Sequence, residues 1–310
     1  MVLVIRVSLQ GQLENTPRRW LELAGRVEAA GFDTLYVADH LGTSPAPFVA
    51  LAAAATFTER IRLGTCVVNA GRWEPLALAT EVATLDVLSG GRSVLGIGAG
   101  HTPAEWSMAG LEIPRPAARI ARLREIVEVV QALLAGQEVS LSGAHVQLKE
   151  AVLKVPRPIQ DPISLMIGGN GPSLLKFAAG CADIVGVTGL GKTLADGHSH
   201  EANWSPDTLD STFDRIRSAA GSANRTPSIE VLVQYVELTN DAGTRASEIA
   251  KVIPGASRSD ILASPFVWIG SPEEIVSQLH GFEERWGVTR FVVREPALSQ
   301  STEIIRMLDA

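Results

Sequence analysis

The chain is poor in the residues that mark disulfide-built, metal-clustered or membrane-spanning proteins. Its 310 residues include two cysteines, Cys66 and Cys181, which is too few for a disulfide framework, and neither lies in a metal-ligand spacing. We therefore expect a cytoplasmic protein in a reducing compartment. The longest apolar stretch, 48–57, is shorter than the roughly 20 residues that span a bilayer, and residues 1–6 are too short for a signal-peptide core.

Positive charge is also scarce. The chain has 27 Lys and Arg against 34 Asp and Glu, a net charge of −7, and it has no basic run. A nucleic-acid partner is therefore not expected, because such binders present a basic face. Hydrophobic residues make up 46% and charged residues 20% of the chain, a composition typical of a globular enzyme and too apolar for disorder.

Short apolar runs alternate with helical patterns along the whole chain. Strands that alternate with helices form a parallel sheet, and eight such strands close a barrel. The pattern therefore predicts an α/β fold, a (β/α)8 TIM barrel that spans 1–310 as a single domain. An open doubly wound sheet is the alternative, with about six strands. The expected strands are 2–9, 34–38, 62–68, 92–97, 163–167, 183–187, 229–236 and 289–293.

An insertion interrupts this rhythm between the fourth and fifth strands, at about 137–162. Residues 139–148 alternate apolar and polar side chains around Gly143, which predicts a hairpin. The proline-rich stretch 156–162 predicts an extended connector. We interpret the region as an insertion in one domain rather than a domain boundary.

Three later segments carry local signals. Residues 189–205 are polar and glycine-rich, and we expect a mobile loop that acts as a lid. Residues 257–269 are expected to be irregular. Ser271 with Glu274 three residues later forms a capping box, which predicts the start of a helix over 272–285.

Polar and glycine residues follow four of the expected strands. Asp39 and His40 follow the second, Asn69 follows the third, and the fourth ends in Gly98, Ala99, Gly100 and His101. Carboxyl ends of parallel strands meet at one edge of a barrel, where active sites lie. Histidine suits proton transfer near neutral pH. A plain turn with a capping aspartate is the alternative interpretation.

The fifth strand is followed by a glycine-rich turn that opens a helix. Free amides at a helix N-terminus bind anions, and a nearby hydroxyl adds a donor. This pattern favours a phosphate site for a cofactor, and a tight turn is the alternative. The residues are Gly168, Gly169, Asn170, Gly171 and Ser173.

One motif is misleading. Residues 186–193 match the P-loop pattern G-x-x-x-x-G-K-T, but no apolar helical periodicity follows them, which a P-loop requires. We therefore do not expect a nucleotide triphosphate on Lys192. His198 and His200 lie close together but lack a third ligand nearby, so no metal site is expected.

An ordered set of motifs over residues 5–293 resembles the bacterial luciferase-like superfamily of flavin and deazaflavin oxidoreductases. The motifs lie at 30–40, 64–68, 85–92, 96–100, 167–169 and 269–275. The resemblance implies a TIM barrel with an insertion, a reduced flavin or deazaflavin in the barrel mouth, and homodimers built from the early barrel helices. The superfamily divides into enzymes that use FMN, often monooxygenases, and enzymes that use the deazaflavin coenzyme F420.

The Ala38-Asp39-His40 ending is similar to the F420 branch. There the Asp contacts the cofactor ring and the His lies near the hydride-transfer centre. By position, the resemblance implies a cis peptide between Cys66 and Val67. The candidate cofactor-binding residues are Asp39, Cys66, Val67, Asn69, Gly98, Ala99, Gly100, Gly168, Gly169, Asn170, Gly171 and Ser173. His40 and His101 are the candidate catalytic residues.

Two positions depart from the F420 branch. His101 stands where several members have an acidic Glu, and Ser44 stands where some have a Trp. The resemblance therefore does not extend to a sugar-phosphate dehydrogenase reaction. We expect an F420-dependent oxidoreductase that moves a hydride between the deazaflavin and a small organic substrate. The alternatives are an FMN-dependent monooxygenase and a cofactor-binding barrel without catalysis.

Overall fold

The computed structural model describes residues 4–13, 16–194 and 200–309. Its largest sheet contains nine hydrogen-bonded strands. They are β1 (Arg6–Gln10), β2 (Thr34–Val37), β3 (Arg62–Thr65), β4 (Val68–Asn69), β5 (Ser93–Gly98), β8 (Ser164–Gly168), β9 (Ile184–Val187), β12 (Ser228–Leu232) and β15 (Val288–Arg294).

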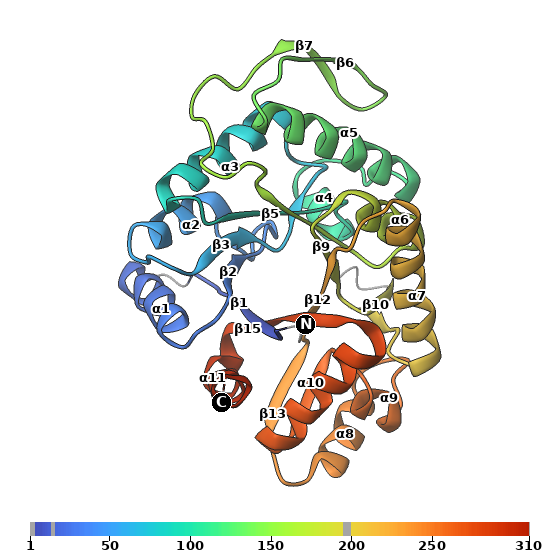
Figure 1. Ribbon diagram of the computed structural model, residues 1–310. Helices are drawn as coiled ribbons and strands as arrows, with labels where there is room; N and C mark the ends of the chain where they lie inside the picture. The colour runs from blue at the N-terminus through green and yellow to red at the C-terminus, as the bar shows by residue number, and fades with distance from the viewer. Residues whose placement is uncertain (1–3, 14–15, 195–199, 310) are drawn as a thin grey trace. The chain divides into compact units, whose positions relative to one another are not determined.

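These strands form a closed parallel barrel. Their order is β3-β2-β1-β15-β12-β9-β8-β5-β4, and β3 also pairs with β5, which returns the sheet to its first strand. β3 and β4 together replace the one strand expected over 62–68, so the (β/α)8 architecture is confirmed (Figure 1). Most strand residues are buried, as expected for parallel strands covered on both faces.

The chain groups into two compact units. Unit 1 comprises residues 1–11, 29–34 and 168–310, and unit 2 comprises 12–28 and 35–167. That the chain is a single domain stays a prediction. Unit 2 carries the helices α1 (Pro17–Ala29), α2 (Pro47–Ala55), α3 (Pro75–Ser89), α4 (Pro103–Met108) and α5 (Pro116–Leu134).

Within unit 2, α3 packs against both α2 and α5, as Figure 1 shows. The predicted insertion hairpin is present as β6 (Val139–Ser142) and β7 (Gln147–Ala151). The Glu125 carboxylate of α5 accepts hydrogen bonds from three consecutive backbone amides in its turn, 144–146. Buried Asp86 of α3 accepts from the backbone amides of Ile159 and Gln160. Carboxylates on two helices therefore anchor the insertion.

Unit 1 carries the remaining described helices and two short strand pairs outside the barrel. The helices are α6 (Pro172–Cys181), α7 (Pro206–Ser222), α8 (Ala242–Ala250), α9 (Arg258–Leu262), α10 (Pro272–Trp286) and α11 (Leu298–Leu308), with the 3-10 helix η1 (Glu295–Ala297). The strands outside the barrel are β10 (Leu190–Thr193), β11 (His200–Ala202), β13 (Tyr235–Leu238) and β14 (Val267–Gly270).

The start of α10 confirms the predicted capping box. The Ser271 hydroxyl accepts from the Glu274 amide, and the Glu274 carboxylate accepts from the Ser271 amide. The helix ends at Gly287 with φ of 71°, a left-handed conformation that glycine adopts without steric cost. Both ends of α10 are therefore determined by adjacent residues.

Three expectations in unit 1 were wrong. Residues 190–193 and 200–202 of the expected loop pair as the antiparallel strands β10 and β11, while 195–199, including His198, lie outside the described residues. The strand expected over 229–236 ends at Leu232, and β13 then pairs with β14. Most of 257–269 is regular, because it forms α9 and part of β14.

A buried charge network lies within unit 1, between β12 and β15 and the residue before β2. The Arg290 Nε donates to Glu230 at 3.3 Å, and its Nη2 donates to Asp33. Asp33 also accepts from the Arg6 Nη1 at 2.6 Å and the Thr34 hydroxyl at 2.8 Å. Burial alone would raise the pKa of Asp33, but the Arg290 and Arg6 guanidinium groups outweigh it and hold that pKa below its ordinary value.

Candidate functional site

Asp39 follows the barrel strand β2 in unit 2 and is buried. Its side chain is 7% exposed. The carboxylate accepts from the Arg72 Nη1 at 2.8 Å, the Trp73 Nε1 at 3.0 Å and the Asn69 amide at 3.2 Å. Asp39 therefore binds the loop that follows β4. A carboxylate has about four lone-pair sites, so one acceptor site remains for a ligand.

The same loop is clamped by α5. The Arg122 guanidinium donates to the carbonyl oxygens of Ala70 at 3.1 Å and Trp73 at 3.1 Å. The Trp73 ring also meets Phe48 edge-to-face, at 5.3 Å between ring centroids. Residues 69–73 are thus held from β2, α2 and α5, which gives the predicted site a rigid wall.

Gly100 lies against Asn69. A Cβ built on Gly100 would stand 2.1 Å from the Asn69 Oδ1, and Gly100 has φ of 71°. Gly96 similarly faces the Thr65 carbonyl, 1.8 Å from its built Cβ. At these two positions the protein's own Thr65 and Asn69 therefore occupy the space beside the glycine.

We predict that Gly100→Ala destabilises the protein by about 2–4 kcal/mol, because it adds a clash to a left-handed backbone. Gly110→Ala is the matched control. Gly110 has the same φ of 71° and nothing within 4 Å of its built Cβ, so it should lose only about 1 kcal/mol. Urea unfolding of both variants measures the difference. Equal losses would show that contact with Asn69 is unimportant.

His40 is exposed and forms a close pair with Glu105. Its Nδ1 lies 2.6 Å from the Glu105 Oε1, although 65 positions separate the two residues in the chain. The His40 side chain is 48% exposed and that of Glu105 is 12% exposed. Sequence reasoning missed Glu105, because α4 is too short to show helical periodicity.

The other predicted residues of unit 2 lie along the ends of adjacent strands. Asn69 pairs with Gly98 across β4 and β5, and the Ala70 amide donates to the Gly98 carbonyl at 2.9 Å. The peptide between Cys66 and Val67 is cis, which confirms that expectation. His101 is exposed in the segment between β5 and α4. The structure therefore brings Asp39, Asn69 and Gly98–Gly100 together within unit 2.

The predicted phosphate turn lies in unit 1. Here Asn170 has a different use from the one expected, because its Oδ1 accepts from the Thr188 and Gly189 amides, each at 3.0 Å. Its Nδ2 donates to the Thr188 hydroxyl. Gly171 caps α6, and Gly171 and Ser173 are exposed. Lys192 lies in β10 and does not open a helix, which supports the rejection of a P-loop.

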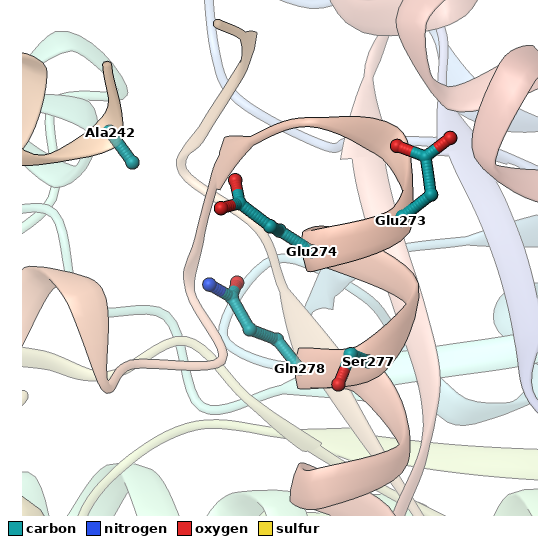
Figure 2. Close-up of a pocket in the computed structure, with 5 residues that line it drawn as sticks. All are labelled: Ala242, Glu273, Glu274, Ser277 and Gln278. Carbon is teal, nitrogen blue, oxygen red and sulfur yellow. The ribbon is translucent and has the colours of Figure 1, made fainter. Parts of the chain in front are cut away.

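A shallow depression of about 440 Å³ lies elsewhere in unit 1, at the start of α10. Figure 2 shows its lining residues, with Glu274 and Gln278 on one side of α10 and Ala242 from α8 beyond them. None of the predicted site residues lines it. Glu274 is engaged in the capping box, so the acidic groups at this depression have a structural use.

No group of three or more His, Cys, Asp or Glu side chains in the part of the chain that the structure describes is arranged to hold a metal ion. Of the helices described, none combines the length and apolar character that crossing a membrane requires.

The chain is similar over nearly its whole length to two known F420-dependent enzymes. A curated F420-dependent glucose-6-phosphate dehydrogenase of Beutenbergia cavernae is 28% identical, over 98% of this chain and 95% of its own. The coenzyme F420-dependent tetrahydromethanopterin reductase of Methanopyrus kandleri has a TM-score of 0.76 at 22% identity, covering 98% of this chain and 97% of its own.

A third similar structure is a long-chain alkane monooxygenase, LadA, with a TM-score of 0.78 at 18% identity over 100% of this chain and 92% of its own. At these identities the structural matches show the fold. The family model for luciferase-like monooxygenases matches residues 1–236. The chain therefore belongs to the luciferase-like monooxygenase family.

Proposed function

We propose that this protein is an F420-dependent oxidoreductase that transfers a hydride between the deazaflavin and a small organic substrate. The observation that carries the proposal is the end of β2, where a buried Asp39 and an exposed, carboxylate-paired His40 stand side by side in sequence. The near full-length similarity to an F420-dependent dehydrogenase supports this choice of cofactor.

The residues of unit 2 fit an anionic cofactor. The Arg119 Nε in the first turn of α5 is buried and has no hydrogen-bond partner among the described residues. Burial lowers the pKa of this guanidinium, because a desolvated cation without a counter-charge is disfavoured. A phosphate or carboxylate on the cofactor's tail would supply that charge. The deazaflavin ring, when bound, supplies the hydride acceptor or donor.

The protein's own part is to hold and to protonate. Asp39 and Asn69 would orient the ring, and Cys66, Val67 and Gly98–Gly100 would line it. Gly168, Gly169, Asn170, Gly171 and Ser173 would hold the phosphate-bearing tail, mainly through backbone amides, since the Asn170 side chain is already bonded. His40 and His101 would move protons at the reacting atoms.

An FMN-dependent monooxygenase is the second candidate, because the matching family is described as luciferase-like monooxygenases. Titrating the purified protein with F420 and with FMN, followed by oxygen uptake during turnover, separates the two. We expect tight F420 binding and no oxygen uptake. FMN preference with oxygen consumption contradicts the proposal, and binding without turnover on a broad substrate panel favours a non-catalytic protein.

Besides the substrate, the expected partner is a second copy of this chain. We expect the protein to act in the cytoplasm and to bind neither nucleic acid nor a membrane. Exposed apolar side chains on and beside α2 and α3 support a homodimer. Val49 is 72%, Phe57 54% and Leu88 50% exposed, and α2 packs against α3. Exposed apolar side chains on neighbouring helices are typical of an interface.

Introducing a charge on these helices is expected to weaken the dimer. Val49→Glu and Leu88→Glu should each raise the dimer dissociation constant by at least about tenfold, since an unpaired charge buried in an interface costs several kcal/mol. Sedimentation velocity over a concentration series measures this. Val155→Glu, at a residue 80% exposed outside α2 and α3, is the control; a dimer unaffected by all three changes would place the interface elsewhere.

A further inference from the structure

The pair formed by His40 and Glu105 has a geometry with chemical consequences. The Nδ1 to Oε1 distance of 2.6 Å is short for a charge-assisted hydrogen bond. Glu105 is the more buried partner, with 12% of its side chain exposed against 48% for His40. The carboxylate thus lies behind the imidazole, and the ring keeps access to solvent or ligand.

The position of Glu105 is determined by its helix. The neighbouring Trp106 is buried, and its ring lies against Gly71, where a built Cβ would come within 2.2 Å of it. Trp106 therefore packs α4 onto the same loop that Asp39 binds. As a result, Glu105 has little freedom to leave His40.

An ionised carboxylate only accepts hydrogen bonds. The His40 nitrogen facing it must therefore carry the proton, so a neutral His40 has its lone pair on Nε2. We propose that Glu105 is a positioning residue, which holds His40 in the Nδ1–H tautomer and thereby makes Nε2 the nitrogen that accepts a proton from a substrate hydroxyl.

The substrate hydroxyl in this inference rests on the proposed function. The tautomer assignment does not, because it follows from the contact between His40 and Glu105. In the proton transfer, the substrate O–H bond breaks, its electron pair stays on oxygen, and the proton forms a bond to Nε2. Glu105 remains ionised throughout and keeps the same hydrogen bond. The imidazolium that forms is then stabilised by the adjacent negative charge.

Nitrogen NMR of protein labelled with ¹⁵N-histidine tests the tautomer without cofactor or substrate. We expect the wild-type His40 to be in the Nδ1–H form when neutral, and Glu105→Ala to shift it toward the Nε2–H form. Glu112→Gln is the control, because Glu112 is exposed nearby in the chain and should leave the His40 signals unchanged. An identical tautomer in wild type and Glu105→Ala overturns the inference.

Activity gives the second measurement. With F420 as cofactor, Glu105→Ala and Glu105→Leu, which has a similar size and no hydrogen-bond acceptor, should lower kcat by at least about tenfold, with KM for the substrate and Kd for F420 within about twofold. In a His40→Ala background, Glu105→Leu should cause no further loss, because the two residues act as a unit. A further full loss there contradicts the positioning role.

The two hypotheses fail separately. If the protein does not bind or reduce F420 while the NMR shows the Nδ1–H tautomer depending on Glu105, the proposed function is wrong and the tautomer assignment stands. If Glu105→Ala fails to fold, as judged by its thermal unfolding, the larger Glu105→Leu is measured in its place, and unchanged kcat in that variant overturns the inference.

Discussion

Replacing His40 with alanine is expected to lower kcat with F420 by about 10²–10⁴-fold, the usual contribution of a positioned acid or base. Cofactor affinity should be largely kept. The reason lies in the geometry of unit 2: Asp39 is bound to Arg72 and Trp73 independently of His40, so the loop at the predicted ring site does not depend on the imidazole.

The control for this prediction is His280→Ala. His280 in α10 also faces a glutamate, with 3.5 Å between its Nδ1 and the Glu283 Oε2, and its side chain is 52% exposed. It resembles His40 in exposure and partner but lies outside the predicted site, so its removal should leave kcat unchanged. Stopped-flow reduction of F420 separates the chemical step from product release. Unchanged hydride transfer in His40→Ala would end the role assigned to this residue.

His101→Ala tests the second candidate catalytic histidine. By the resemblance, His101 stands where several members of the F420 branch have an acid, and the structure gives it an exposed position beyond β5. If His101 donates a proton in one direction of the reaction, it accepts that proton in the reverse direction, so His101→Ala should lower kcat/KM by the same factor in both directions. Unchanged kcat/KM would show that His101 takes no part in proton transfer.

The largest expected effect on stability is that of Asp33→Ala. It should lower the free energy of unfolding by about 3–5 kcal/mol, the cost of leaving a buried charge without its partner. The partner is Arg290, whose side chain is 7% exposed, as against 8% for Asp33. Guanidinium unfolding at neutral pH measures the loss.

A surface ion pair in the same unit provides the matched control. Asp214 and Arg217 are 65% and 48% exposed, and such pairs contribute about 0–1 kcal/mol. Asp214→Ala should therefore change stability much less than Asp33→Ala. Equal effects would mean that burial of the Asp33 pair is unimportant.

The same network predicts a pH dependence. The pKa of Asp33 is held below its ordinary value in the folded protein, because the Arg290 and Arg6 charges outweigh the opposing effect of burial. Its stabilisation is therefore complete above the unfolded pKa of about 3.9 and is lost as the pH falls through the folded pKa. The difference in the free energy of unfolding between wild type and Asp33→Asn should decrease as the pH falls from the unfolded pKa through the folded pKa of Asp33. A difference that stays constant over this pH range would contradict the lowered pKa.

How far the sequence predicts this molecule depends on how far apart the interacting residues lie. The Ser271–Glu274 capping box spans one helical turn, and its pattern is readable directly. The eight-strand alternation is likewise a sum of local signals, which is why the barrel was predictable. The cis peptide between Cys66 and Val67 was implied by the resemblance alone, because no property of those two side chains indicates it.

Contacts between residues that lie far apart in the sequence could not be predicted. Glu105 meets His40 across 65 positions, and Asp39 meets Arg72 across 33; nothing in either local pattern pairs them. Asn170 looked like a ligand donor because it follows a strand, yet its amide bonds the backbone after β9. The pairing of β10 with β11 was missed because polar, glycine-rich strands lack the alternation that marks a strand.

In the proposed reaction, a hydride passes directly between substrate and F420, with no oxygen involved. The most direct test is turnover under anaerobic conditions with a substrate, found by screening alcohols and phosphorylated sugars, that carries deuterium on its reacting carbon. We expect mass spectrometry to find one deuterium on the reduced cofactor. A reaction that requires oxygen, and places ¹⁸O from ¹⁸O₂ in the product, would contradict it.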